Sequence, residues 1–532
     1  MWLGVIAAAW ALAGTPGLAR AEEAATKAAG PYVVIVGAGE YLDKAIKPRP
    51  TADADAKALY DLLVDPKYLG VKPNRIKLFL SEPDAKRNGE VASHDAIVKA
   101  VDAATTSTGK DDLLLLAFFG RGATTGDKTV YLTPDTTFKD RAKTALVFSD
   151  LEPAFKKVKG QKVLMVMDVV YKGFEPGMEK VAEPTLTDVD AMLFGSDDKE
   201  ESVRVENRLL LLSGFVSSES ISKGDHSLFT SVLIDALKGA ADMPPNNEGY
   251  EPDGVVTVDE MLKYLEKEIP AQARMLGKTD KEKESQAVPI GSRTSHFVLT
   301  KNPAETAKVN KRLDAFAALV KSGDINESIG KEGTAFLSRM PKLKANQELR
   351  KNYEKLADGT LKTADFLAAR DRIREEMKLA PKDAGEFVRK VNEAIGIVTS
   401  VYIKSTQPTD LAVAAIKGMY RRIEEPLPTD LEASLKAAKD LNEGQRNDLL
   451  KDARMRLGKR EDLEGNKDAD VAILMMMASL NDPYSVYYDL ETKRRMESAL
   501  RGRFAGVGIQ IRRDAVHDAL LVVSPIKGSP AY

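Results

Sequence analysis

The chain has 532 residues, of which 43% are hydrophobic and 30% charged, and its formal net charge is −2. This length favours several domains, and the composition is that of a globular protein. The near-neutral charge gives no indication of a nucleic-acid partner or an anionic membrane. With no cysteine and only four histidines, the chain has no thiolate metal site and no cysteine nucleophile. A His-rich metal site is implausible, and we expect no cofactor.

The N-terminus has the pattern of a secretory signal peptide over residues 1–21. An apolar run from Leu3 to Ala13 precedes Ala19-Arg20-Ala21, which fits a small-residue cleavage site. No lysine or arginine precedes the run, so either the amino terminus supplies the charge or the true start lies upstream. An uncleaved anchor is the less favoured alternative, because the run is too short to span a bilayer. We therefore expect an exported protein, periplasmic or extracellular, with no other integral membrane segment.

Residues 31–300 alternate strand and helix patterns. Continuous apolar runs predict strands at 32–37, 75–80, 112–119, 162–170 and 208–215. Helical periodicity and cap residues predict helices at 51–65, 93–105, 150–158, 227–241 and 257–269. Strands separated by helices indicate an α/β fold, with a mostly parallel sheet covered by helices on both faces.

Two segments in this region resemble ligand loops only superficially. "VGAGEY" (36–41) lacks the third glycine of a dinucleotide loop, which would fall at Leu42, so a turn glycine after the first strand is the better interpretation. "GYEPDGVVTVDE" contains Asp253, Gly254 and Glu260, but its first loop position is Gly249, which has no side-chain ligand for calcium. A turn followed by a helix cap is favoured there.

The pattern changes twice after residue 300. Long Lys-, Glu-, Ala- and Leu-rich stretches predict an all-α region, which we divide into a helical linker at 301–384 and a second helical region at 385–495. The segments 503–514 and 519–532 predict two β-strands. Two strands do not form a stable domain alone, so 500–532 has the pattern of a truncated β-rich domain.

Several ordered motifs in residues 31–300 match one known family. "VIVGAGEY" and "ADADAKAL" correspond to a first strand with an IGxxxY turn and a helix with an NDA triplet. "AFFGRG" and "VYLTPD" correspond to a strand ending in Y-F-S-G-H-G and an LLP-D segment. "DVVYKG" stands where D-x-C-x-S-G is found, and "SLFTSVLIDALKGAAD" matches a G-x-F-T helix. The region resembles the caspase/metacaspase-like cysteine peptidases, which implies a caspase-like fold.

This resemblance also implies that the catalytic dyad is lost. The family's histidine base corresponds to Arg121 and its cysteine nucleophile to Val170. Valine has no nucleophilic atom, and a guanidinium stays protonated and has no acceptor. Asp168 matches the position that helps to bind a basic substrate side chain. We expect Arg121 either to pair with Asp168 at the top of the sheet or to point into solvent from a loop; the sequence favours neither.

A second resemblance covers about residues 385–532. "EFVRKVNEAIGIVTSVYI", "LNDPYSVYYDLET" and "GRFAGVGIQI…LLVVSPIKGSPAY" resemble the N-terminal part of carboxyl-terminal processing (tail-specific) serine proteases, up to the opening of their PDZ domain. The family's catalytic serine and lysine follow that domain, beyond the end of this chain. The resemblance implies that a peptide carboxylate binds backbone N–H groups at Phe504, Ala505, Gly506, Val507, Gly508 and Ile509.

These patterns leave three classes of function open. The first is an exported peptidase-family protein whose caspase-like domain is inactive and binds peptides or protein partners. The second is the N-terminal part of an active, PDZ-containing processing protease encoded by a longer gene. The third is a decayed gene product without a selected role. The sequence favours the first, and whether the chain is an enzyme stays open.

Overall fold

The computed structural model describes most of the chain from residue 30 onward. The described residues are 30–109, 112–126, 128–158, 162–171, 186–194, 207–214, 221–244, 251–291, 296–423, 425, 427–480, 482, 485–490, 493, 509–514, 519–525 and 531. The expected signal peptide and the expected peptide-binding positions 504–508 therefore lie outside the described residues.

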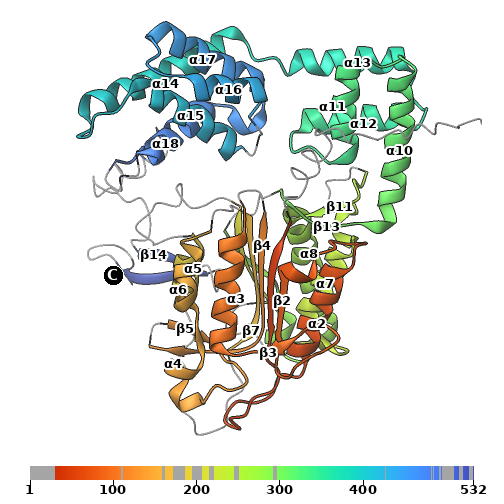
Figure 1. The fold of residues 1–532 in the computed structure, drawn as a ribbon, viewed down its shortest axis with the longest axis vertical. Coiled ribbons are helices and arrows are strands. Elements are labelled where there is room, and N and C mark those ends of the chain that lie inside the picture. The colour runs from red at the N-terminus through yellow and green to blue at the C-terminus, as the bar shows by residue number, and fades with distance from the viewer. Residues whose placement is uncertain are drawn as a thin grey trace, which may run out of the picture.

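A nine-stranded, mostly parallel sheet organises the first half of the chain (Figure 1). Seven strands follow one another in the order β12-β8-β7-β4-β1-β2-β3, and β5 and β6 extend from β4. Its strands are β1 (Tyr32–Gly37), β2 (Ile76–Leu80), β3 (Glu90–Val91), β4 (Leu113–Thr125), β5 (Lys128–Tyr131), β6 (Leu146–Val147), β7 (Lys162–Val170), β8 (Arg208–Leu212) and β12 (Val288–Gly291). Strands β1, β4, β7 and β8 pair in parallel, whereas β12 joins β8 antiparallel and β5 forms a hairpin with the end of β4. The predicted α/β class is confirmed.

Side-chain alternation along β4 buries both faces of the sheet. Leu114, Leu116 and Phe118 pack toward α3 (His94–Ser107), α5 (Glu152–Phe155) and α6 (Thr187–Phe194). Leu115 and Phe119 pack on the opposite face, toward α2 (Thr51–Val64), α7 (Leu228–Leu237) and α8 (Val258–Leu276). Figure 1 shows these two helical layers on either side of the sheet. A strand buried on both faces needs a continuous apolar run, which is why the pattern in the sequence identified β4 correctly.

Short elements complete this part of the chain. They are η2 (Pro73–Arg75), η3 (Phe138–Asp140), α4 (Arg141–Thr144), η4 (Phe148–Leu151), β9 (Ser222–Lys223), β10 (His226–Ser227), η6 (Ala240–Asp242), β11 (Val255–Thr257), α9 (Asp280–Lys283) and β13 (Val298–Lys301). Strand β11 pairs antiparallel with β13 beside the main sheet.

The segment around Asp253 forms a turn and a helix cap, as predicted. Gly254 has φ +83, a conformation that favours glycine. Thr257 caps α8, and the Glu260 carboxylate accepts hydrogen bonds from the Thr257 backbone N–H (2.9 Å) and hydroxyl (2.7 Å). The Glu260 side chain therefore completes a buried capping box instead of binding a cation.

Two buried carboxyl groups near this cap make stability depend on pH. Burial, and then the charge of Asp253, raise the pKa of Glu260 to about 8 and that of Asp242 to about 7. Above about pH 4 the unfolded chain loses these protons while the folded chain keeps them. We therefore expect the free energy of unfolding to fall as pH rises from 5 to 8, by at most about 1.4 kcal/mol per pH unit for each proton.

Urea unfolding of the whole chain at pH 5, 6.5 and 8 measures this dependence. Glu260→Gln should flatten the profile, because the amide oxygen can still accept from Thr257 but does not titrate. Equal slopes for the variant and the parent would contradict the assignment to Glu260.

The second half of the chain is helical where it is described between residues 303 and 480. The first group of helices comprises α10 (Pro303–Lys321), α11 (Glu327–Ser338), α12 (Lys344–Ala357) and α13 (Thr363–Glu376). The second comprises α14 (Pro381–Val401), α15 (Pro408–Arg422), α16 (Thr429–Ala437), α17 (Glu443–Leu457), η7 (Glu461–Leu463) and α18 (Lys467–Ser479). Each group has its own apolar core, the first around Phe316, Tyr353 and Phe366. The predicted all-α region is confirmed.

Arg350 of α12 fastens the first helical group to the sheet-containing part. Its guanidinium is almost fully buried and donates to the carbonyl oxygens of Glu251 (2.7 Å) and Pro252 (3.2 Å). It also pairs with Glu354 at 3.0 Å. A buried arginine with these acceptors fixes how the helices sit on the preceding residues.

The two predicted C-terminal strands are β14 (Ile509–Asp514) and β15 (Ala519–Pro525), which pair antiparallel. The PDZ assignment stays a prediction. Of the helices in the described ranges, none combines the length and apolar composition needed to cross a membrane.

Candidate functional site

Strands β4 and β7 place Arg121 and Val170 side by side. The two strands are parallel, and their register pairs Arg121 with Val170 and Phe119 with Asp168. Strand β4 continues through Gly120-Arg121-Gly122 to Thr125, so the expectation that Arg121 lies in a loop is wrong. The two sequence positions compared with a catalytic dyad are thus direct neighbours at the carboxyl end of the sheet.

The glycines on either side of Arg121 are required by close packing. Gly120 has φ +157, and a Cβ there would lie 2.9 Å from both the Ala38 carbonyl oxygen and the Tyr131 hydroxyl. A Cβ at Gly122 would lie 2.4 Å from the ring of Tyr171. The backbone around Arg121 therefore approaches its neighbours more closely than any other residue type permits.

Asp168 forms a buried ion pair with Arg49. The Arg49 Nη2 lies 2.7 Å from the Asp168 Oδ1, and both side chains are almost inaccessible to solvent. The Nη1 of Arg49 also donates to the carbonyl oxygens of Gly120 (3.0 Å) and Asp168. Arg49 lies between β1 and α2 in sequence. Its side chain contacts the carboxyl ends of both β4, at Gly120, and β7, at Asp168.

Three further residues close the cluster around Asp168. The Ser227 hydroxyl donates to Asp168 Oδ2 at 2.6 Å and accepts from the backbone N–H of Thr230 (3.1 Å) as the cap of α7. The Asp55 carboxylate accepts from the Ser227 N–H (3.2 Å) and lies 2.9 Å from the Nδ1 of His226. Because the Ser227 hydroxyl is committed to Asp168, it is poorly placed to act as a nucleophile.

The charges in this cluster are balanced. Burial, and secondly the charge of Asp168, raise the pKa of Asp55 well above its ordinary value, although Arg49 opposes the shift. A protonated Asp55 leaves the Asp168 carboxylate facing the Arg49 guanidinium, with one charge of each sign. The charge of Asp168, the residue that resembles a substrate-binding position, is thus neutralised by Arg49 of the same chain.

Arg121 forms hydrogen bonds with Lys47 and Pro48, the two residues that precede Arg49. Its Nε donates to the carbonyl oxygen of Lys47 (2.5 Å), its Nη2 donates to that of Pro48 (3.0 Å), and its backbone N–H donates to the Tyr41 hydroxyl (3.0 Å). The predicted Arg121–Asp168 ion pair is therefore wrong, since Asp168 pairs with Arg49. The alternative, a side chain that simply points into solvent, is wrong as well.

The N–H groups that follow β1 are already engaged. The Gly39 N–H lies 3.0 Å from Asp53 Oδ2 and 2.9 Å from the Ser81 Oγ, and the Ser81 N–H donates to Asp53 Oδ1 (2.8 Å). The Gly39 N–H is therefore engaged within the chain, which agrees with the interpretation of "VGAGEY" as a turn.

The family model described as Caspase domain matches residues 31–289. Residues 31–289 form a caspase-like domain. The range contains both neighbouring positions, Arg121 and Val170, and all the residues that surround Asp168.

Solved structures similar to this chain include the protein GSU0716 from Geobacter sulfurreducens and caspase-1 from Spodoptera frugiperda. The first is 14% identical, with a TM-score of 0.30, and the match covers 51% of this chain and 94% of that one. The second is 13% identical, with a TM-score of 0.31, and the match covers 52% of this chain and 91% of that one. At this identity neither protein informs the activity of the chain.

A shorter similarity connects the chain to serine proteases. The carboxy-terminal processing protease CtpA of Bacillus subtilis is 41% identical over 68 residues, which is 13% of this chain and 14% of that protein. The probable CtpA-like serine protease of Staphylococcus aureus (strain COL) is 35% identical over 68 residues, 13% of each. The chain therefore spans only about one seventh of the length of these curated relatives.

Sequence reasoning identified Asp168 but missed Arg49, Asp55 and Ser227. Arg49 lies between two prolines just before α2, and Asp55 lies on the face of α2 that is otherwise apolar. A carboxylate on an apolar helical face was the available signal. Its partner could not be identified from sequence because His226 and Ser227 lie more than 170 positions away.

Proposed function

We propose that the caspase-like domain does not cleave peptides and serves as a binding domain of an exported protein. The observation that carries this proposal is the strand register that sets Arg121 beside Val170. An arginine cannot accept a proton, and a valine cannot attack a carbonyl, so neither position supplies general-base or nucleophilic chemistry.

The ion pair between Arg49 and Asp168 supports the same conclusion. A basic substrate side chain would have to displace a buried guanidinium that is paired with Asp168 at 2.7 Å. Breaking such a pair is strongly unfavourable. Peptide or protein partners therefore bind elsewhere than at Asp168, whose carboxylate is engaged by Arg49 and Ser227.

A second candidate function rests on the similarity to the processing proteases. The chain would then be the N-terminal part of a PDZ-containing serine protease, exported through residues 1–21. Residues 504–509 would bind peptide carboxylates, and the catalytic residues would be encoded downstream of Tyr532. The nucleotide sequence after the codon for Tyr532 tests this candidate.

Hydrolysis of fluorogenic peptides with Arg or Lys before the scissile bond tests the first proposal. The purified chain should release no fluorophore above the buffer rate. Turnover that is lost in Asp168→Asn would refute the inactive site. Turnover that persists in Asp168→Asn but is blocked by a serine-directed inhibitor would refute an inactive chain and favour the second candidate.

A further inference from the structure

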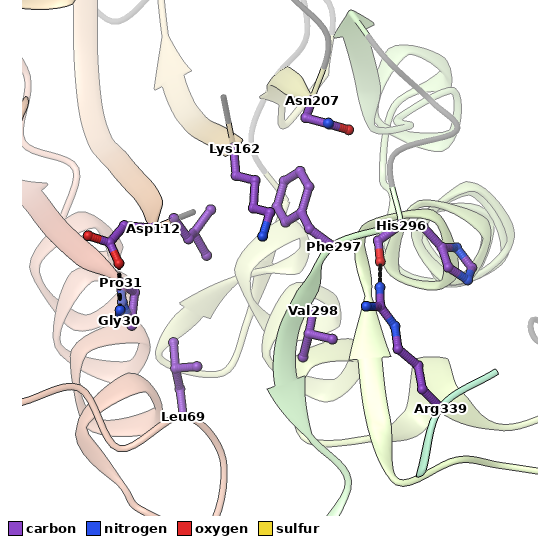
Figure 2. Close-up of a pocket in the computed structure, with 11 residues that line it drawn as sticks. Gly30, Pro31, Leu69, Asp112, Lys162, Asn207, His296, Phe297, Val298 and Arg339 are labelled. Atoms are coloured by element: carbon purple, nitrogen blue, oxygen red, sulfur yellow. Dashed lines mark hydrogen bonds between the residues drawn. The ribbon is translucent and has the colours of Figure 1, made fainter. Parts of the chain in front are cut away.

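A cavity of about 350 Å³ lies at the end of the sheet opposite to Arg49 and Asp168 (Figure 2). It lies beside the amino ends of the parallel strands, where β4 begins at Leu113 and β7 at Lys162. Its far wall includes Arg339, which follows α11 of the first helical group. The cavity thus lies between the caspase-like domain and the helices, a common place for ligand sites.

Two cationic side chains flank this cavity. Figure 2 shows Lys162 reaching into its middle from the start of β7, with Arg339 on the facing wall. The Nη2 of Arg339 donates to the carbonyl oxygen of His296, which fixes the guanidinium. A guanidinium has five N–H donors, and this bond uses one of them.

Asp112, the acidic residue among the described lining residues, is turned to other partners. The Asp112 carboxylate accepts from the backbone N–H of Gly30 (2.7 Å) and of Gly109 (2.8 Å). Figure 2 shows its oxygens directed toward Gly30, away from Lys162. The imidazole of His296 also points away from the cavity and pairs with Asp259 at 2.8 Å. Among the described lining residues, Lys162 and Arg339 are therefore the charged side chains that face the cavity.

The rest of the lining is largely apolar. Phe297 is buried beside Lys162, and Leu69 and Val298 contribute aliphatic surface. Asn207 adds one amide that can donate and accept. The volume is at the small end of the range for ligand pockets, roughly 300–1,000 Å³.

We propose that this cavity binds a small organic carboxylate that carries an apolar group. Lys162 and Arg339 would hold the carboxylate by charge-assisted hydrogen bonds, and the apolar group would lie against Phe297. The carboxylate could belong to a free small molecule or to the C-terminus of a peptide. The site is separate from the Arg121 site, so its test is independent of whether that site cleaves peptides.

Isothermal titration of the whole chain with 3-phenylpropionate and with its neutral amide tests the proposal. We expect the acid to bind with a millimolar or tighter Kd and the amide to bind at least about tenfold more weakly, as expected for lost hydrogen bonds to charged groups. Equal binding of acid and amide, or no binding of either, would overturn it.

Variants locate the binding. Lys162→Gln and Arg339→Gln should each weaken 3-phenylpropionate about tenfold, whereas Arg339→Lys, which keeps the charge but not the guanidinium, should weaken it less than Arg339→Gln does. Lys331→Gln is the matched control, because Lys331 lies exposed on α11 and pairs with Glu327. Unchanged affinity in both glutamine variants, with melting temperatures like the parent's, would overturn the proposal.

A peptide arm distinguishes the two sources of the carboxylate. N-acetyl-alanyl-phenylalanine is compared with its C-terminal amide. Tighter binding of the free acid than of 3-phenylpropionate supports a peptide C-terminus as the ligand. Binding of 3-phenylpropionate alone supports a free small molecule.

Discussion

Arg49→Ala is expected to lower the free energy of unfolding by about 3–5 kcal/mol, because it leaves the Asp168 carboxylate buried without its cation. Asp168 is about 1% exposed in the parent, where the Arg49 guanidinium is the cation that pairs with its carboxylate. Chemical denaturation of the whole chain measures the loss. Arg389→Ala is the control, because Arg389 forms exposed pairs with Glu386 and Glu393, and its removal should leave the unfolding curve unchanged.

The cavity left by Arg49→Ala should accept a guanidinium from solution. Methylguanidinium at low millimolar concentration should raise the melting temperature of Arg49→Ala but not that of the parent. Methylammonium should rescue less, because its single nitrogen does not reproduce the two nitrogens with which Arg49 bonds Asp168 and the Gly120 carbonyl oxygen. Equal effects of both cations on both proteins would contradict specific occupation of the pocket.

Combining Arg121→His with Val170→Cys is expected to produce a reactive thiol without producing peptide turnover. The two positions are register neighbours on β4 and β7, so an imidazole and a thiol would lie side by side. The imidazole should lower the thiol pKa, and iodoacetamide should react faster near pH 7 than it does with Val170→Cys alone. Hydrolysis of arginine-containing peptides should still be absent, because Arg49 remains paired with Asp168 and excludes the arginine of the substrate from it.

Adding Arg49→Ala to that double variant should allow hydrolysis. A positioned acid–base group contributes on the order of 100-fold or more, so the triple variant should exceed Val170→Cys with Arg49→Ala by about that factor. Circular dichroism confirms that each variant is folded. A double variant that already cleaves arginine-containing peptides as fast as the triple variant would contradict closure by Arg49.

The apolar runs in the sequence correctly predicted the parallel strands β1, β2, β4, β7 and β8, but not the two-residue strand β3. Strand β4 illustrates both the success and its limit: a strand at 112–119 was predicted, but β4 continues to Thr125. The extension forms a local antiparallel hairpin with β5, and the glycines at 120 and 122 hid its strand character from the apolar pattern. Helix α8 likewise continues to Leu276, beyond the predicted end, because Pro270 does not end it.

The candidate site was predicted less completely than the fold. The positions Arg121, Val170 and Asp168 came from motif order, whereas the partner of Asp168 did not. Arg49 reaches Asp168 across 119 positions of sequence, and only the fold brings β1, β4 and β7 together at one edge. An arginine between two prolines has no local signal of burial, since arginine is usually exposed.

A double-mutant cycle between Arg49 and Asp168 tests most directly whether Arg49 neutralises Asp168 in the folded chain. The free energy of unfolding is measured for the parent, Arg49→Ala, Asp168→Ala and the double variant. A buried pair at 2.7 Å predicts that the double variant loses about 2–3 kcal/mol less than the sum of the single losses. If the two single losses of unfolding free energy add up to that of the double variant within about 0.5 kcal/mol, the Arg49–Asp168 ion pair is contradicted.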